Sequence, residues 1–128
     1  RILDTTFFNE QESFFAHKEG ANCSTFISPK VLVTGGKDAM LRLWNLETNE
    51  SLLEIPAHNF AVYDLVFMKE MNKIISCSRD KTIKIWNTTS GKELKTLNGH
   101  THYVNSLVVL PDNTLASGSA DKKIKIWN

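Results

Sequence analysis

Apolar and polar residues alternate over short segments of the chain, and turn-forming residues separate these segments. Alternation over about four to eight residues is typical of a strand that buries one face of a sheet. No apolar pattern with helical spacing extends far enough to compete with it. The pattern therefore predicts an all-β protein. The expected strands cover residues 23–27, 31–34, 41–44, 52–55, 62–68, 73–77, 83–86, 94–97, 104–110, 114–117 and 124–127, with a further short piece at 14–15.

The same residue types return at intervals of about 42 positions. Each interval contains a His, an Asp and a Trp, and the Asp precedes the Trp by six residues every time. A fixed period of this length is typical of a repeat architecture. We divide the chain into one array of three repeats, at about 4–45, 46–87 and 88–128, and interpret residues 1–3 as the tail of a preceding repeat. Because the chain also begins with Arg1 rather than Met, we expect it to be a segment of something longer.

A hydroxyl residue recurs with the His, the Asp and the Trp, so each repeat contains four polar side chains at matched positions. The three sets are His17, Thr34, Asp38 and Trp44; His58, Ser76, Asp80 and Trp86; and His100, Ser117, Asp121 and Trp127. If the four side chains meet, the imidazole can link the carboxylate to the hydroxyl, and the hydroxyl can bind the indole N–H. The same types occur in Ser-His-Asp hydrolases. Threefold repetition at constant spacing favours a structural network over a catalytic centre.

These motifs resemble those of the WD-repeat (Trp-Asp repeat) family of β-propellers, over essentially the whole chain. The resemblance is carried by Gly99-His100 and by residues 115–121 and 124–128. It implies four-stranded antiparallel blades around a channel, and it assigns the four polar residues of each repeat to a hydrogen-bonded tetrad. The chain departs from the family pattern at two kinds of position. Asn follows each Trp where the family has Asp, which keeps an acceptor for turn hydrogen bonds, and Ala16 and Ala57 replace the Gly before His.

The resemblance also bears on how a ring would close. Propellers typically have four to eight blades, so three blades cannot close one. In this family the outermost strand of each blade belongs to the following repeat. Residues 10–16 would therefore complete a blade outside this chain, and the last blade would lack its outer strand. We expect a β-propeller segment of about three four-stranded blades, open unless completed by a second chain or a longer parent. A homodimer would have six blades, and a longer parent is the interpretation that we favour.

Composition limits the partners of the chain. Its 128 residues include 15 Lys and Arg and 14 Asp and Glu, which leaves a net charge of +1 and does not favour nucleic acid or an anionic membrane. The longest apolar runs have about four residues, far fewer than the ~20 that a membrane-spanning helix needs. Two distant Cys residues do not make a disulfide scaffold, and we expect an intracellular, cytoplasmic protein. No cofactor motif is present, and His100 with His102 is too small a set for zinc.

We expect a non-catalytic scaffold that binds other proteins. The family usually binds through the face that carries the loops after each His, and exposed aromatic and Arg side chains often anchor a partner. The candidate partner-binding residues are Lys37, Phe60, Tyr63, Arg79, His102 and Tyr103. Tyr63 and Tyr103 could instead pack between blades, and that alternative stays open.

The alternative functions are a propeller-based hydrolase and a module that binds a small ligand or glycan. Asp64 is the only acid outside the repeat in a strand expected near the channel, and we expect it to meet a Lys or water there. A basic residue repeats in the strands that end in Trp, and we expect a solvated or ion-paired edge rather than a nucleic-acid stripe. These basic residues are Arg42, Lys84 and Lys125. Cys23 and Cys77 are expected to be buried thiols.

Overall fold

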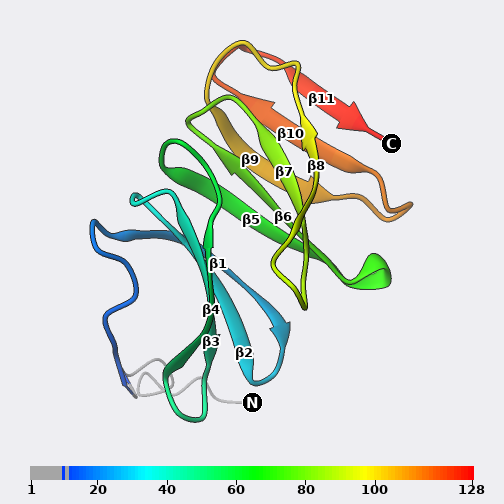
Figure 1. Ribbon diagram of the computed structural model, residues 1–128. Coiled ribbons are helices and arrows are strands. Elements are labelled where there is room, and N and C mark those ends of the chain that lie inside the picture. The colour runs from blue at the N-terminus through cyan, green and yellow to red at the C-terminus, as the bar shows by residue number, and fades with distance from the viewer. Residues whose placement is uncertain (1–9, 11) are drawn as a thin grey trace, which may run out of the picture.

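The computed structural model describes residue 10 and residues 12–128, which form three antiparallel β-sheets (Figure 1). The first sheet contains β1 (Ala21–Ser28), β2 (Val31–Gly36), β3 (Met40–Asn45) and β4 (Glu50–Pro56). The second sheet contains β5 (Val62–Met68), β6 (Lys73–Ser78), β7 (Ile83–Asn87) and β8 (Glu93–Leu97). The third sheet contains β9 (Val104–Val109), β10 (Leu115–Ser119) and β11 (Ile124–Trp127). A short 3-10 turn, η2 (Lys69–Met71), connects β5 to β6.

Strands that follow one another in the chain pair side by side, so each sheet is an antiparallel meander. The turns that lead into β4 and β8 depend on the Asn after each Trp. Asn45 Oδ1 accepts the Glu47 N–H over 2.8 Å, and Asn87 Oδ1 accepts the Thr89 N–H over 2.9 Å. Side-chain bonds of this kind are what make Asn a turn residue. The third sheet has no counterpart of β4 and β8 among the described residues, so the outer edge of β11 has no partner strand there.

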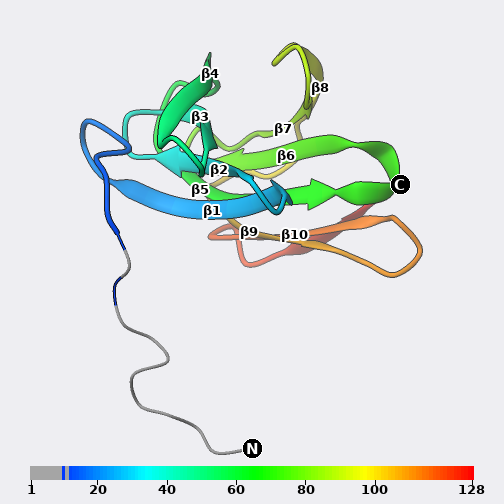
Figure 2. The ribbon, with the colours of Figure 1, turned by 90° about the horizontal axis from the view of Figure 1, so that it is seen from below.

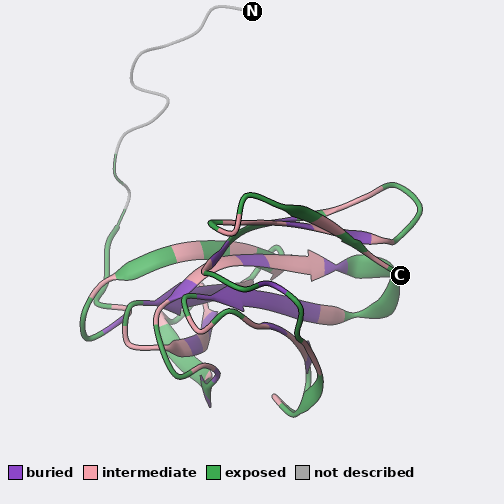
Figure 3. Ribbon diagram, turned by 90° about the horizontal axis from the view of Figure 1, so that it is seen from above, coloured by how far each residue is buried: buried purple, intermediate pink, exposed green. Residues whose placement is uncertain are grey.

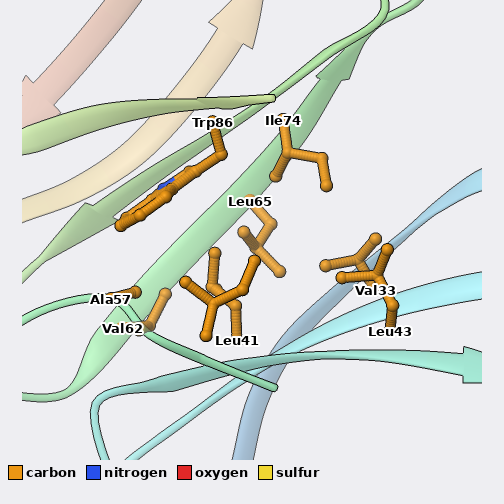
Figure 4. Packing of buried hydrophobic residues seen from close by; sticks show 9 residues of the cluster. Val33, Leu41, Leu43, Ala57, Val62, Leu65, Ile74 and Trp86 are labelled. Carbon is orange, nitrogen blue, oxygen red and sulfur yellow. The ribbon is translucent and has the colours of Figure 1, made fainter. Parts of the chain in front are cut away.

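The three sheets pack face to face in chain order, and Figure 2 shows them as successive layers. Their innermost strands lie side by side, β1 against β5 and β5 against β9. Two hydrophobic clusters fill the spaces between the layers. The cluster between the first and second sheets contains Val33, Leu41, Leu43, Ile55, Ala57, Val62, Leu65, Ile74 and Trp86 (Figure 4). The cluster between the second and third sheets contains Met68, Ile75, Cys77, Ile83, Val104, Leu107 and Leu115.

Gly35 allows the first two sheets to approach closely. A Cβ atom at this position would lie 2.7 Å from Val62 Cγ1 and 2.9 Å from Cys23 Sγ. Both distances are shorter than side-chain packing tolerates, so a larger residue in β2 would push β1 or β5 away. The absence of a side chain at Gly35 is therefore part of the packing between these layers.

The outward face of the third sheet is open within the described part of the chain. Ile124 and Ile126 are 76% and 61% exposed, whereas Ile83, which has the place of Ile124 in the second sheet, is fully buried. Ile85, the counterpart of Ile126, packs against the second cluster. Figure 3 shows the same contrast, because burial is concentrated in the middle layer. The predicted all-β arrangement of about three open, antiparallel sheets is confirmed.

The strand at 14–15 is the part of the strand prediction that the structure contradicts. Phe14 and Phe15 belong to no strand, because the blade that they would complete is not among the described residues. Instead, the Phe14 ring packs on Trp44, with the ring centroids 5.1 Å apart. The predicted repeat tail at residues 1–3 lies outside the described residues. Within the described part of the chain, no helix is long and apolar enough to cross a membrane.

Candidate functional site

In the second repeat, four side chains form one continuous hydrogen-bonded network. His58 Nδ1 lies 2.8 Å from Asp80 Oδ2, and His58 Nε2 lies 2.7 Å from the Ser76 hydroxyl oxygen. The Trp86 indole N–H donates to the same hydroxyl over 2.9 Å. Every group is satisfied when His58 carries its proton on Nδ1, because the ring then donates to the carboxylate and accepts from Ser76.

The first and third repeats contain the same network. The contacts and their lengths are His17–Asp38 (3.0 Å), His17–Thr34 (2.7 Å), Trp44–Thr34 (2.8 Å), His100–Asp121 (2.7 Å), His100–Ser117 (2.8 Å) and Trp127–Ser117 (2.8 Å). The structure thus brings together the four residues that the sequence predicts for each of the three tetrads. Each hydroxyl is buried, and each network links the loop before an inner strand to the middle of its sheet.

Each tetrad carboxylate also binds backbone N–H groups of two loops. In the second repeat, Asn59 donates to Asp80 Oδ2 over 3.3 Å, and the Thr82 N–H donates to Oδ1 over 2.9 Å. The Thr82 hydroxyl adds a bond of 2.6 Å to Oδ1. Burial opposes ionisation of Asp80, but the hydrogen bonds from His58 and Thr82 outweigh it and lower the pKa of this carboxyl. The pKa values of the other two tetrad carboxyls are lowered in the same direction.

The residue after each tetrad Asp adopts a left-handed backbone conformation. The φ angles are 69° at Ala39, 76° at Lys81 and 72° at Lys122. Residues other than Gly rarely adopt positive φ, and here the tetrad Asp stabilises each turn by accepting the N–H two positions later. A tight turn is expected at each repeated Asp, but its left-handed conformation was not predicted, because Ala and Lys carry no signal for it. Only their constant place after the repeated Asp could have indicated it.

A hollow of about 900 Å³ lies beside the tetrads, where the loops lead into the inner strands. Five of the six predicted partner-binding residues line it, and we call it the rim hollow. They are Lys37, Phe60, Tyr63, Arg79 and Tyr103. Glu19 and Asn59, which the sequence also places on this loop-bearing face, line the hollow as well, together with Asn22 and Asn105, which were not predicted. Most lining residues occupy equivalent positions in successive repeats. Lys37 and Arg79, for example, each directly precede a tetrad Asp.

Arg79 lies at the centre of an aromatic group in the rim hollow. Its guanidinium carbon is 5.5 Å from the centroid of the Phe60 ring and 5.4 Å from that of Tyr103, within the range of a cation–π contact. Tyr63 meets Tyr103 edge to face, with centroids 6.1 Å apart. Phe60 remains 53% exposed. Cation, rings and solvent-exposed apolar area are thus combined on one surface.

The remaining predicted residues support this aromatic group from different sides. His102 does not line the rim hollow, but its ring packs against Tyr103 with the centroids 4.3 Å apart. Tyr63 lines the hollow and also packs against the cluster between the second and third sheets. Packing between sheets and exposure at the rim, which the sequence left as alternatives, both apply to Tyr63.

A protein-family model described as "WD domain, G-beta repeat" matches residues 8–45, 49–87 and 91–128. The chain belongs to the WD40-repeat family. The three matches cover most of the chain, and each contains one complete tetrad. The resemblance that the motifs indicate is confirmed.

Several WD40-repeat relatives are longer proteins. Nuclear distribution protein nudF 1 of Talaromyces marneffei is 34% identical over 122 residues, which are 91% of this chain and 26% of that protein. WD repeat and SOCS box-containing protein 1 of Homo sapiens is 35% identical over 101 residues, 77% of this chain and 24% of that protein. The chain spans about a quarter of the length of these curated relatives.

Two further similarities concern proteins whose names mention U3. The U3 small nucleolar RNA-associated protein 15 homolog of Xenopus tropicalis is 30% identical over 120 residues, 91% of this chain and 23% of that protein. A solved structure described as "Structure of U3-55K" superposes with a TM-score of 0.83 at 25% identity, over 89% of this chain and 37% of the solved one. The superposition extends the agreement from the repeat motifs to the arrangement of the WD40 blades.

Asp64 joins two neighbouring WD40 blades. Its Oδ1 accepts the Leu65 N–H over 2.8 Å, and its Oδ2 accepts the Leu107 N–H over 2.9 Å, from β5 to β9. Asn22 forms an analogous link from β1 to β5, since its side-chain amide donates to the Val62 carbonyl over 3.0 Å. Asp64 forms no ion pair with a Lys among the described residues, and a backbone donor on the inner edge strand β9 binds its carboxylate instead.

The basic residues of the third strands lie at ion-paired edges, as predicted, where an outer strand is present. Arg42 binds Glu54 of β4 over 2.7 Å, and Lys84 binds Glu93 of β8 over 3.1 Å. Lys125 occupies the same position in β11, where the described chain has no outer strand to supply a carboxylate.

The cysteines are free thiols. Cys77 is buried as predicted, whereas Cys23 is only partly buried because it lies on the inner strand of the first sheet. Burial raises the pKa of Cys23 to about 12 and raises that of Cys77 as well, so both thiols stay protonated at neutral pH. Among the described residues, no group of three or more His, Cys, Asp or Glu side chains is placed to hold a metal ion.

Proposed function

We propose that the chain is a non-catalytic protein-interaction module that binds a partner protein at the rim hollow. The observation that supports this most directly is the group formed by Arg79, Phe60 and Tyr103, in which an exposed cation and two rings are placed together. Arg and aromatic side chains supply much of the binding energy in protein interfaces. The loops that carry this surface are also held in place by the three tetrads.

The geometry of the tetrads does not favour a hydrolase. A nucleophilic hydroxyl must reach its substrate, but Ser76 is fully buried and Ser117 is 1% exposed. Both hydroxyl oxygens also accept an indole N–H, which occupies one of their two lone pairs and makes them weaker nucleophiles. The same buried network occurs once in each of the three blades, as a structural role requires, whereas a single reaction would need only one such site. A module for small ligands or glycans has less support, because the rim hollow is open to solvent rather than enclosed.

We further propose that these three blades belong to a larger propeller. Ile124 and Ile126 are exposed at positions that the second sheet buries against its neighbour, so a further blade would cover them. The relatives are about four times as long as the matched segment, which supports a longer parent over a homodimer. Free cysteines support an intracellular location.

Site-specific photo-cross-linking tests the proposed surface. A photoreactive phenylalanine analogue replaces Phe60 in one sample and Leu94, an exposed residue of β8, in a matched control. After irradiation in an extract of the source cells, the adducts are identified by mass spectrometry. We expect protein adducts from position 60 that are lost when Arg79→Ala is added, and that do not form from position 94. Equal adducts from both positions, or adducts to RNA alone, would contradict the proposal.

A further inference from the structure

Two cations in the rim hollow have no carboxylate partner. Six ion pairs occur among the described residues, including the three of the tetrads, and neither Lys37 nor Arg79 takes part in any of them. Arg42 and Lys84, in the third strands of their blades, are by contrast paired with Glu54 and Glu93. Other cations such as Lys92 also form no ion pair within the described part of the chain, but Lys37 and Arg79 line the same hollow.

Both cations line the hollow, and two aromatic rings position Arg79 there. The Phe60 and Tyr103 rings lie near the Arg79 guanidinium. A ring face binds the charge without accepting all of its hydrogen bonds, so the N–H groups of Arg79 that are not directed at Tyr103 can still donate. The aliphatic part of Lys37 passes over Gly20, where a Cβ would lie 3.7 Å from Lys37 Cδ. The two rings limit the freedom of the Arg79 side chain, which reduces the entropy that it loses on binding.

The hollow also contains two carboxylates, and their hydrogen-bond and ion-pair partners decide whether they compete with a ligand for Lys37 and Arg79. Asp38 accepts from His17 and from the backbone N–H groups of Lys18 and Met40, so its oxygens are occupied. Glu19 is exposed and is not paired with Lys37 or Arg79. The hollow therefore has one exposed negative group against two unpaired positive groups.

We propose that the rim hollow recognises an acidic side chain, an Asp or Glu, in an exposed segment of the partner protein. Arg79 binds the carboxylate, Lys37 adds a second positive charge, and Phe60 and Tyr103 contact apolar atoms next to it. This inference rests on the proposed function, because it names the chemistry of the partner at that same surface. A protein is favoured over RNA because two cations and a net charge of +1 give little attraction for a phosphate chain.

A random dodecapeptide library displayed on phage provides the probe. The library is selected against the purified protein, and an enriched peptide is synthesised with its Asp and Glu residues either kept or replaced by Asn and Gln. Dissociation constants are measured by fluorescence polarisation. We expect the amide peptide to bind about tenfold or more weakly, since a charge-assisted bond is lost. Arg79→Gln should reduce this preference to about twofold or less, because the two changes remove the same interaction.

Two further variants make the test specific. Glu19→Gln should strengthen binding of the acidic peptide, because it removes the exposed negative charge of the hollow. Lys92→Gln removes an exposed cation outside the rim hollow and should leave binding unchanged. If the two variants change binding by equal amounts in opposite directions, the effect is one of net charge and the inference is wrong.

The outcomes separate this inference from the proposed function. Peptides that lose binding with Phe60→Ala but show no preference for acid would overturn the inference and leave the proposed function standing. Peptides insensitive to both Phe60→Ala and Arg79→Gln, or no enrichment at all, would contradict both. Stronger competition by a uridine dodecamer than by the acidic peptide would show that the hollow binds phosphate and would overturn the acidic side chain as its ligand.

Discussion

Replacing Asp80 with Ala tests whether the tetrads stabilise the blades. The carboxylate accepts hydrogen bonds from His58 Nδ1, from the Thr82 hydroxyl and N–H, and from the Asn59 N–H. The His58 side chain is fully buried, so its Nδ1–H cannot bind water after the change. One buried donor without an acceptor costs about 1–3 kcal/mol, whereas Asn59 is exposed and can recruit water. The free energy of unfolding should therefore fall by about 1–3 kcal/mol.

Urea denaturation followed by tryptophan fluorescence measures this loss, and a thermal scan should show a fall of about 4 °C per kcal/mol. Asp80→Asn is the informative second variant. Its amide can still accept from the backbone but presents a donor to His58, which forces either two facing donors or the other tautomer. In the other tautomer, Ser76 would have to accept from both His58 and Trp86 and would lose its own acceptor. Asp80→Asn should therefore recover less than half of the loss. An Asp80→Ala protein as stable as the wild type would refute the reasoning.

Three other predictions concern pH, the rim and the packing of the sheets. The tetrad Asp pKa values are lowered in the folded state, so stability should be full above about pH 4 and fall as the pH drops further, as checked by urea denaturation between pH 3 and 7. Phe60→Ala and Arg79→Ala should each weaken partner binding about tenfold without lowering the denaturation midpoint, as measured by fluorescence polarisation and thermal scans. Gly35→Ala should destabilise the protein by about 1–3 kcal/mol, because the new methyl group meets Val62 Cγ1 at 2.7 Å. Gly118→Ala is its control in calorimetry and should cost less, because its close contact is a surface hydroxyl that can rotate away.

The fold and the tetrads could be predicted because their signals repeat. Alternation marks each strand. The six-residue interval between Asp80 and Trp86 recurs in every repeat and the interval from His to Asp varies by only one residue, so chance is a poor explanation for the pattern. A network that needs four residue types at fixed spacing also leaves little freedom in how the chain folds around it. Each of the three sets consequently meets in the structure as the spacing indicates.

Features that occur in only one repeat, or that depend on which strand lies next to another, could not be predicted from the sequence. Asp64 has no counterpart in the other repeats, and its bond to Leu107 requires knowing that β5 lies beside β9. The strand expected at 14–15 failed for a related reason, since a strand needs a partner and Phe14 finds only Trp44. The φ values at Lys81 and its equivalents are fixed by hydrogen bonds to the tetrad Asp rather than by the residue itself.

The rim hollow and the tetrads are parts of one arrangement. Arg79 directly precedes Asp80, and Phe60 follows His58 by two residues, so the bond between His58 and Asp80 sets the distance between the loops that present the cation and the ring. The Asn59 N–H bond to Asp80 fixes the same loop a second time. Because these bonds are buried or lie next to buried groups, thermal motion of the loops is limited, and the Arg79–Phe60 contact is largely formed before a partner arrives. The tetrad residues thus determine the shape of the surface that we propose for binding. The same spacing in all repeats lets the chain vary the rim, with Lys37 in one repeat and Arg79 in the next, while the supporting bonds stay unchanged.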